Sequence, residues 1–187
     1  MNPRRVVTGH NAGGRAVVVL DEIVHPVTID LLPGNAWHLL GGADKILTFP
    51  NDGSDAPTRS YFPSVGGFRF RFITFPPDGA QPARDTVDRD AALREFEEKL
   101  PGMAAHMEPE HPGMHTTGTV DCGMIIAGEI TLELDDGLTV NLKAATPLCR
   151  TARGIDGRTR VTRRQRCASL RSALIMKESP RSPAELL

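Results

Sequence analysis

Short apolar runs separated by turn residues make up most of the first 144 positions, and they predict a protein built mainly of β-strands. Residues 5–10 and 15–21 are β-prone runs on either side of Asn11-Ala12-Gly13-Gly14. A turn-rich tetrapeptide between two such runs predicts a β-hairpin. Further strands are expected over residues 27–32 and 37–40.

A strict alternation of aromatic and basic residues marks positions 68–75, where FRFRF precedes Ile-Thr-Phe. The period of two predicts a strand that buries one face and exposes the other to water. Aromatic residues at strand spacing belong more often to a core than to a ligand site. The phenylalanines, together with Trp37, are therefore expected to be core.

One stretch has helical spacing instead. Residues 86–100 carry Leu93, Phe96 and Leu100 on one face, and Pro101-Gly102 follows. Acidic residues near the start and a Pro-Gly stop predict an amphipathic helix over this range. A second, short helix is expected over residues 168–176.

The runs 124–126, 130–134 and 138–142 are again β-prone, and Asp135-Asp136-Gly137 separates the last two. An Asp-Gly turn between apolar segments favours a hairpin. With 18 glycines and 15 prolines in 187 residues, the chain fits many short strands better than a helical bundle. An all-β class with one or two helices follows.

Composition changes abruptly after Ala144. Residues 145–187 hold ten Lys or Arg, three Asp or Glu and no aromatic residue, whereas the whole chain has a net charge of −1. Such asymmetry of charge suggests a tail that behaves differently from the rest of the chain. We expect a barrel domain with an N-terminal β extension over 1–144, and a basic, poorly ordered or improvised tail over 145–187.

Cysteine usage and hydropathy bear on the compartment. The three cysteines share no metal-type spacing, so reduced thiols are expected. No window approaches the roughly 18 apolar residues of a membrane span. The sequence therefore favours a cytoplasmic protein.

One motif points to chemistry: His115-x-Thr117, three residues, Asp121, six residues, Gly128. It resembles the first motif of the cupin superfamily, which typically runs His-x-His, three or four residues, Glu, six residues, Gly. The following GEITLELDDGLTVNLK is similar to the hairpin of many small cupins. The resemblance covers about the first three quarters of the chain, and it implies a small double-stranded antiparallel β-barrel whose C-terminal part is incomplete or improvised.

The resemblance also implies functional residues. His115 matches the first metal ligand and Asp121 stands where the family has glutamate, while Thr117 replaces the second histidine. Asp121 is thus both a candidate ligand and a candidate proton-handling, catalytic carboxylate. The metal would be iron, manganese, nickel or zinc, held weakly or not at all. An equally open alternative is that His115 and Asp121 belong to a hydrogen-bond network at the barrel mouth.

Two more histidines, His106 and His111, lie just before this motif. Pro109 and Pro112 beside them predict a bent loop whose side chains do not need to converge. Solvated loop histidines are the favoured interpretation.

The second cupin motif, which supplies the last metal histidine, is expected directly after Lys143. The chain reads AATPLCRTARGIDGRTR there and has no histidine after His115. Loss of one base in the codon of Ala144 would explain this, because the shifted frame permits a cupin-like motif with a histidine across Gly154 and Ile155. The alternative is a native basic tail, and the gene sequence would decide between them.

Three functions remain open. The first is a cupin whose intact relatives are metal-dependent oxygenases, isomerases or decarboxylases on a small organic substrate, with an impaired metal site here. The second is a noncatalytic small-molecule-binding module. The third is a nonspecific nucleic-acid binder using the arginines at 158–166, which is disfavoured because no aromatic platform accompanies them. Since cupins are often dimers, the resemblance further implies a homodimer.

Overall fold

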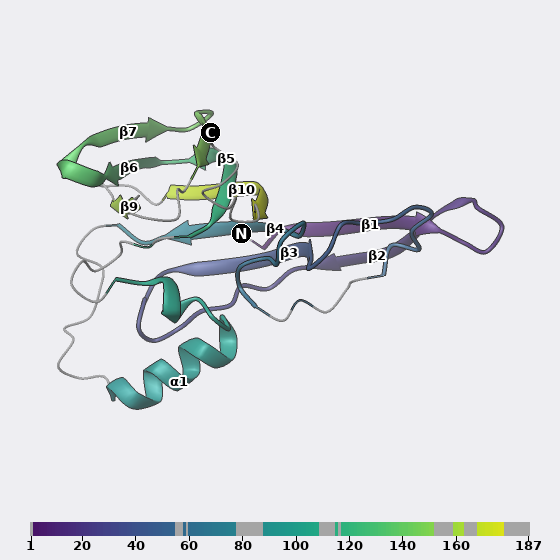
Figure 1. Cartoon of the computed structure of the whole chain (residues 1–187), viewed down its shortest axis with the longest axis horizontal. Helices are drawn as coiled ribbons and strands as arrows, with labels where there is room; N and C mark the ends of the chain where they lie inside the picture. Colours follow the sequence, from purple (N-terminus) through teal and green to yellow (C-terminus); the bar gives the residue numbers. More distant parts are fainter. Residues whose placement is uncertain are drawn as a thin grey trace, which may run out of the picture.

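A computed structural model describes residues 2–54, 58, 60–77, 88–108, 115, 117–151, 159–162 and 168–177, with side chains described as far as residue 150 except Asp135. The strands are antiparallel, and an α-helix lies beside them (Figure 1). The elements are β1 Arg4–His10, β2 Ala16–Ile23, β3 Ala36–Ala43, β4 Phe68–Phe75, α1 Arg89–Lys99, η2 Ala104–His106, β5 Thr119–Ala127, β6 Glu129–Leu134, η3 Asp135–Gly137, β7 Thr139–Lys143, β8 Pro147–Thr151, β9 Thr159–Thr162 and β10 Ala168–Lys177. The predicted mainly-β class is confirmed.

From β5 onward the chain alternates between two sheets. The larger sheet has the order β3-β4-β10-β5-β8, and the smaller has the order β7-β6-β9. Thus β5, β8 and β10 lie in one sheet, while β6, β7 and β9 lie in the other. This alternation is that of a double-sheet jelly roll, the architecture of cupins. The cupin-like antiparallel barrel expected from the sequence is confirmed.

The C-terminal part contributes three of these strands. β10 lies between β4 and β5 and pairs with both, and β9 pairs with β6. The helix expected over residues 168–176 is therefore wrong. A run of nine residues cannot sustain a helix without tertiary packing, whereas two neighbouring strands offer it hydrogen bonds on both sides. The division of the chain at residue 144 and the shifted-frame hypothesis stay predictions.

The first hairpin forms as predicted, with β1 paired to β2 from Arg4↔Ile23 to His10↔Ala16. It makes a two-stranded sheet of its own and projects away from the body (Figure 1). The strand expected over residues 27–32 is wrong apart from Val27, which bridges Trp37. Beyond it the backbone turns, because the Leu32 N–H donates to the Ile29 carbonyl at 3.3 Å.

The predicted helix is α1, which the Asp88 carboxylate caps by accepting from the backbone N–H groups of Asp90 and Ala91. Residues 86 and 87 lie outside the described part. Phe96 and Leu100 pack with Ile29 and Trp37 in one core cluster. No helix in the described part of the chain is long and apolar enough to cross a bilayer, and a cytoplasmic location stays a prediction.

A second core cluster joins the two sheets. It consists of Ile125 from the larger sheet and of Ile130, Leu132 and Leu142 from the smaller one. Ile125 is fully buried. Every second residue of β5, counted from Ile125, therefore lies on the inner face of the barrel.

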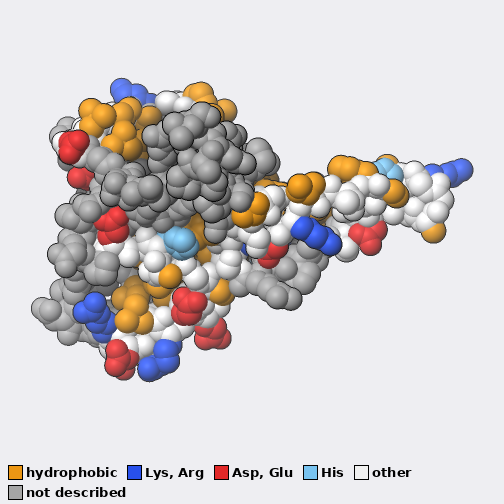
Figure 2. All heavy atoms as spheres, in the orientation of Figure 1, with side chains coloured by type: hydrophobic (Ala, Val, Ile, Leu, Met, Phe, Trp, Pro, Cys, Tyr) orange, Lys and Arg blue, Asp and Glu red, His pale blue; other side chains and the backbone are white. Residues whose placement is uncertain are grey.

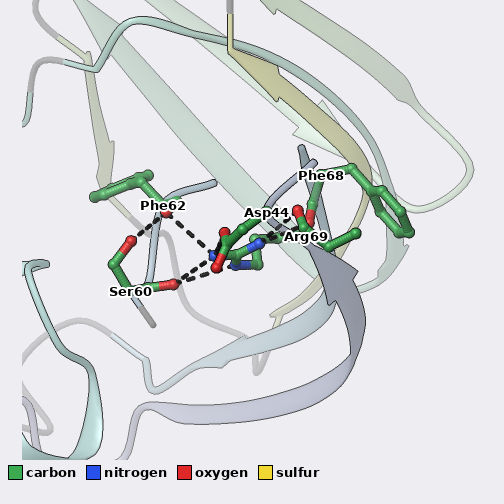
Figure 3. Close-up of polar contacts among 6 residues, drawn as sticks. Asp44, Ser60, Phe62, Phe68 and Arg69 are labelled. Carbon is green, nitrogen blue, oxygen red and sulfur yellow. Dashed lines mark hydrogen bonds and ion pairs between the residues drawn. The ribbon is translucent and has the colours of Figure 1, made fainter. Parts of the chain in front are cut away.

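The side chains of β4 are inverted relative to the sequence-based expectation. Arg69 and Arg71 are 6% and 2% exposed, whereas Phe70 is 37% exposed. Arg69 is satisfied by an ion pair to Asp44 at 2.5 Å and by backbone carbonyls, as Figure 3 shows. The acceptors are the carbonyls of Ala43, Ser60, Phe62 and Phe68. A guanidinium with this many acceptors is tolerated in the interior, so hydropathy alone assigned the wrong face.

Arg69→Met should therefore destabilise the protein by about 3 kcal/mol or more, because it leaves a carboxylate and several carbonyls without their donor. The midpoint of urea unfolding measures this. Arg94→Met on the exposed side of α1 is the matched control, with an expected change within about 0.5 kcal/mol. Equal effects of the two substitutions would contradict a structural role for Arg69.

Candidate functional site

The two residues that the motif singled out lie together, and an arginine joins them. Asp121 in β5 is directly opposite Arg150 in β8, and the Arg150 Nη2 atom forms an ion pair with Asp121 Oδ2. The same Nη2 atom lies 3.3 Å from His115 Nε2. His115 is itself held by a β-bridge to Met107.

This group faces the barrel interior. Asp121, Gly123 and the fully buried Ile125 are every second residue of β5. Residues at this spacing lie on the same face of a strand. The side chains of Arg150 and Asp121 are 15% and 17% exposed. The pair is therefore largely shielded from water.

Arg71 approaches the same face from β4. Its Cα pairs with that of Ser172 in β10, which in turn pairs with Gly123 in β5. Opposed residues of an antiparallel sheet point to the same side, so the guanidinium of Arg71 and the carboxylate of Asp121 share the inner face. Gly123 places no side chain between them.

An aromatic ring supports the Arg71 guanidinium. Its Cζ atom lies 3.8 Å from the centroid of the Tyr61 ring, a cation–π contact. Burial lowers the pKa of Arg71, an effect that the nearby Tyr61 and Asp121 partly offset. Burial likewise raises the pKa of Tyr61. Both shifts reflect a site that is dry and carries charge.

Several polar atoms of this site have no hydrogen-bond partner among the described residues. In that part of the chain, the buried Nε and Nη2 atoms of Arg71 find no acceptor, and the buried Oδ1 atom of Asp121 finds no donor. Two guanidiniums face one carboxylate, so these three groups together carry an excess positive charge. Orphaned buried groups of this kind are rare and call for an explanation.

The donor set does not fit a divalent metal. The guanidinium of Arg150 contacts both predicted ligands, His115 and Asp121, so a dication there would meet a fixed positive charge at close range. Thr117, in place of the second histidine, shares a hydrogen bond of 2.8 Å with Thr119. Within the described ranges, no three His, Cys, Asp or Glu side chains gather as a metal site. The metal roles of His115 and Asp121 and the catalytic role of Asp121 stay predictions.

Of the two histidines that precede the motif, His106 packs its ring edge-on against Phe62, with centroids 4.5 Å apart. His111 lies outside the described residues.

Sequence reasoning missed Arg71, Tyr61 and Arg150 as site residues. The FRFRF pattern was the available signal for Arg71. Alternation places the arginines and the phenylalanines on opposite faces of the strand, but it does not show which face is buried. Arg150 gave no signal, since its position opposite Asp121 depends on the pairing of β5 with β8.

Among known proteins, similarity is found at the level of structure and not of sequence. No family model and no curated protein matches the sequence. The structure is similar to the cupin domain of Schizosaccharomyces pombe Cnp3, with 9% identity, a TM-score of 0.46, and 95% of this chain and 90% of that chain covered. It is also similar to an ethanolamine utilization protein Q from Salmonella typhimurium, with 10% identity, a TM-score of 0.42, and 96% and 99% covered.

On its own strand order, the chain has a cupin-like fold. At 9–10% identity and TM-scores below 0.5, these similarities carry no argument about the site, and the function must rest on the side chains of this protein.

Asp121→Ala should destabilise the protein by about 3 kcal/mol, because it removes a carboxylate that faces the guanidiniums of the buried Arg71 and the largely shielded Arg150. Urea unfolding measures the change, and Glu98→Ala on the exposed surface of α1 is the control. A loss below about 0.5 kcal/mol would show that Asp121 does not hold the charged cluster together.

Proposed function

We propose that this protein is a noncatalytic cupin-fold module that binds a small molecule inside its barrel. The observation that carries the proposal is the position of Arg150, whose guanidinium lies against both His115 and Asp121. A fixed organic cation here takes the place that the cupin resemblance gives to a metal.

The inner face favours binding because its polar groups are incomplete. Two of the Arg71 nitrogens, Nε and Nη2, and the second oxygen of Asp121 are buried without partners among the described residues, while Tyr61 and Trp37 supply apolar surface beside them. A few convergent polar groups in an otherwise apolar interior are typical of small-molecule sites. A ligand that supplied the missing partners would remove the free-energy cost of leaving them buried.

The enzymatic alternative needs a set of metal ligands that the described residues do not bring together. Metal-assisted chemistry requires a cation with an open coordination position, and two donors already engaged by Arg150 are a poor basis for one. The nucleic-acid alternative rests on arginines at 158–166, whose side chains lie outside the described part, so no observation favours it.

The protein should therefore retain well below one equivalent of metal. Incubation with iron, manganese, nickel or zinc, followed by dialysis and elemental analysis, measures the content. A thermal-shift screen of small metabolites should give stabilising compounds whose effect EDTA does not change. About one equivalent of tightly held metal that His115→Ala abolishes would instead support the enzyme.

A second copy of the chain is the proposed partner of the β1–β2 hairpin. An isolated two-stranded hairpin is marginally stable in water. Five of its apolar side chains are 37–63% exposed: Val6, Val17, Val18, Val19 and Ile23. Figure 2 shows apolar side chains along this projecting arm. Pairing with the same apolar surface of another copy would cover them on both arms at once.

Val18→Lys should accordingly weaken the dimer, since it places a charge on the most exposed of these residues. Light scattering coupled to gel filtration would show a shift towards monomer mass. Leu93→Lys, on an apolar residue of α1 that is 41% exposed, should leave the mass unchanged. A monomeric wild-type protein would exclude the proposal.

A further inference from the structure

Arg71 is a buried arginine whose hydrogen bonding is incomplete. It is 2% exposed, and the two nitrogens on the side edge of its guanidinium, Nε and Nη2, are buried without an acceptor in the described part of the chain. Arg69, two residues earlier on the same strand, has every such need met by Asp44 and backbone carbonyls. The described part of the fold thus supplies hydrogen-bond acceptors for the whole guanidinium of Arg69 but not for Nε and Nη2 of Arg71.

The unpaired edge has a defined geometry. Nε–H and one Nη2–H of a guanidinium are parallel donors whose spacing matches the two oxygens of a carboxylate. The face of the guanidinium is fixed on the Tyr61 ring at 3.8 Å, so the donor edge is held in one plane. Such pre-organisation favours a bidentate anion over a single neutral acceptor.

The charges of the site point to the same kind of ligand. Arg71 and Arg150 carry two positive charges and Asp121 one negative charge, so one more anion would balance the cluster. Because Oδ1 of Asp121 is an unpartnered acceptor, it would receive a hydrogen bond from a donor elsewhere on that anion.

We propose that Arg71 anchors a small carboxylic acid that also carries a hydroxyl or amino group. Arg71 Nε and Nη2 donate side-on to its carboxylate, and its hydroxyl or amino group donates to Asp121 Oδ1. The inference rests on the proposed small-molecule-binding function and names the class of ligand that the same site takes.

Three fragments and two variants test it. Glycolate has the carboxylate and the hydroxyl, acetate has the carboxylate alone, and glycolamide has the hydroxyl with a neutral amide in place of the carboxylate. Thermal shift and calorimetric titration of dialysed, full-length protein at equal ionic strength give their relative affinities. The variants are Arg71→Met and, as an exposed control on α1, Arg94→Met.

We expect affinity in the order glycolate, acetate, glycolamide, and a glycolate affinity weakened roughly tenfold or more in Arg71→Met. Without added ligand, Arg71→Met should melt at a higher temperature than wild type, because two unsatisfied buried donors are replaced by an apolar side chain of similar length. Arg94→Met should change neither property.

The opposite results are equally informative. A lower melting temperature of ligand-free Arg71→Met would make the guanidinium a structural group and overturn the inference, as would the absence of any response to glycolate. If glycolamide stabilised the metal-free protein as well as glycolate did, small-molecule binding would stand and the carboxylate anchor would fail. If every response required added metal, the proposed function itself would fail.

Discussion

Burial of positive charge on the inner face of the barrel is the constraint on which the rest of this structure depends. Taking a guanidinium out of water is unfavourable unless acceptors replace its hydration. For Arg69 the fold supplies them through Asp44 and the backbone of the segment around Ser60. For Arg150 it supplies Asp121. Arg71 receives an aromatic ring and, among the described residues, no acceptor for Nε and Nη2, which is why we propose it as the anchor of a ligand.

The architecture explains why these arginines meet. In a jelly roll, strands distant in the sequence become neighbours, because successive segments alternate between two sheets. β4, β5 and β8 are brought into one sheet with β10 between the first two. Arg71, Asp121 and Arg150 therefore share a face although 79 positions separate the first from the last. β10 acts as the spacer that fixes the distance between Arg71 and Asp121.

The candidate site changes how the motif at 115–128 should be interpreted. His115 and Asp121, the two residues that the motif singled out, lie close together, since the Arg150 side chain touches both. The motif could not show that a guanidinium would lie between them, because the arginine comes from a strand outside the motif. The metal-binding pattern and the anion site that we propose thus share two residues and differ in a third. The sign of the charge at the centre then selects the ligand.

Local signals in the sequence determined the elements with local causes. The turn at residues 11–14 produces the first hairpin, the Asp88 cap and the spacing of Phe96 and Leu100 produce α1, and the Asp-Gly turn separates β6 from β7. Tertiary structure alone decided which face of β4 is buried, because a period of two is the same for either face. It also decided that residues 168–177 form a central strand, since the two partner strands lie more than 40 residues away along the chain. The charge at the site was decided in the same way, by pairings that local sequence does not encode.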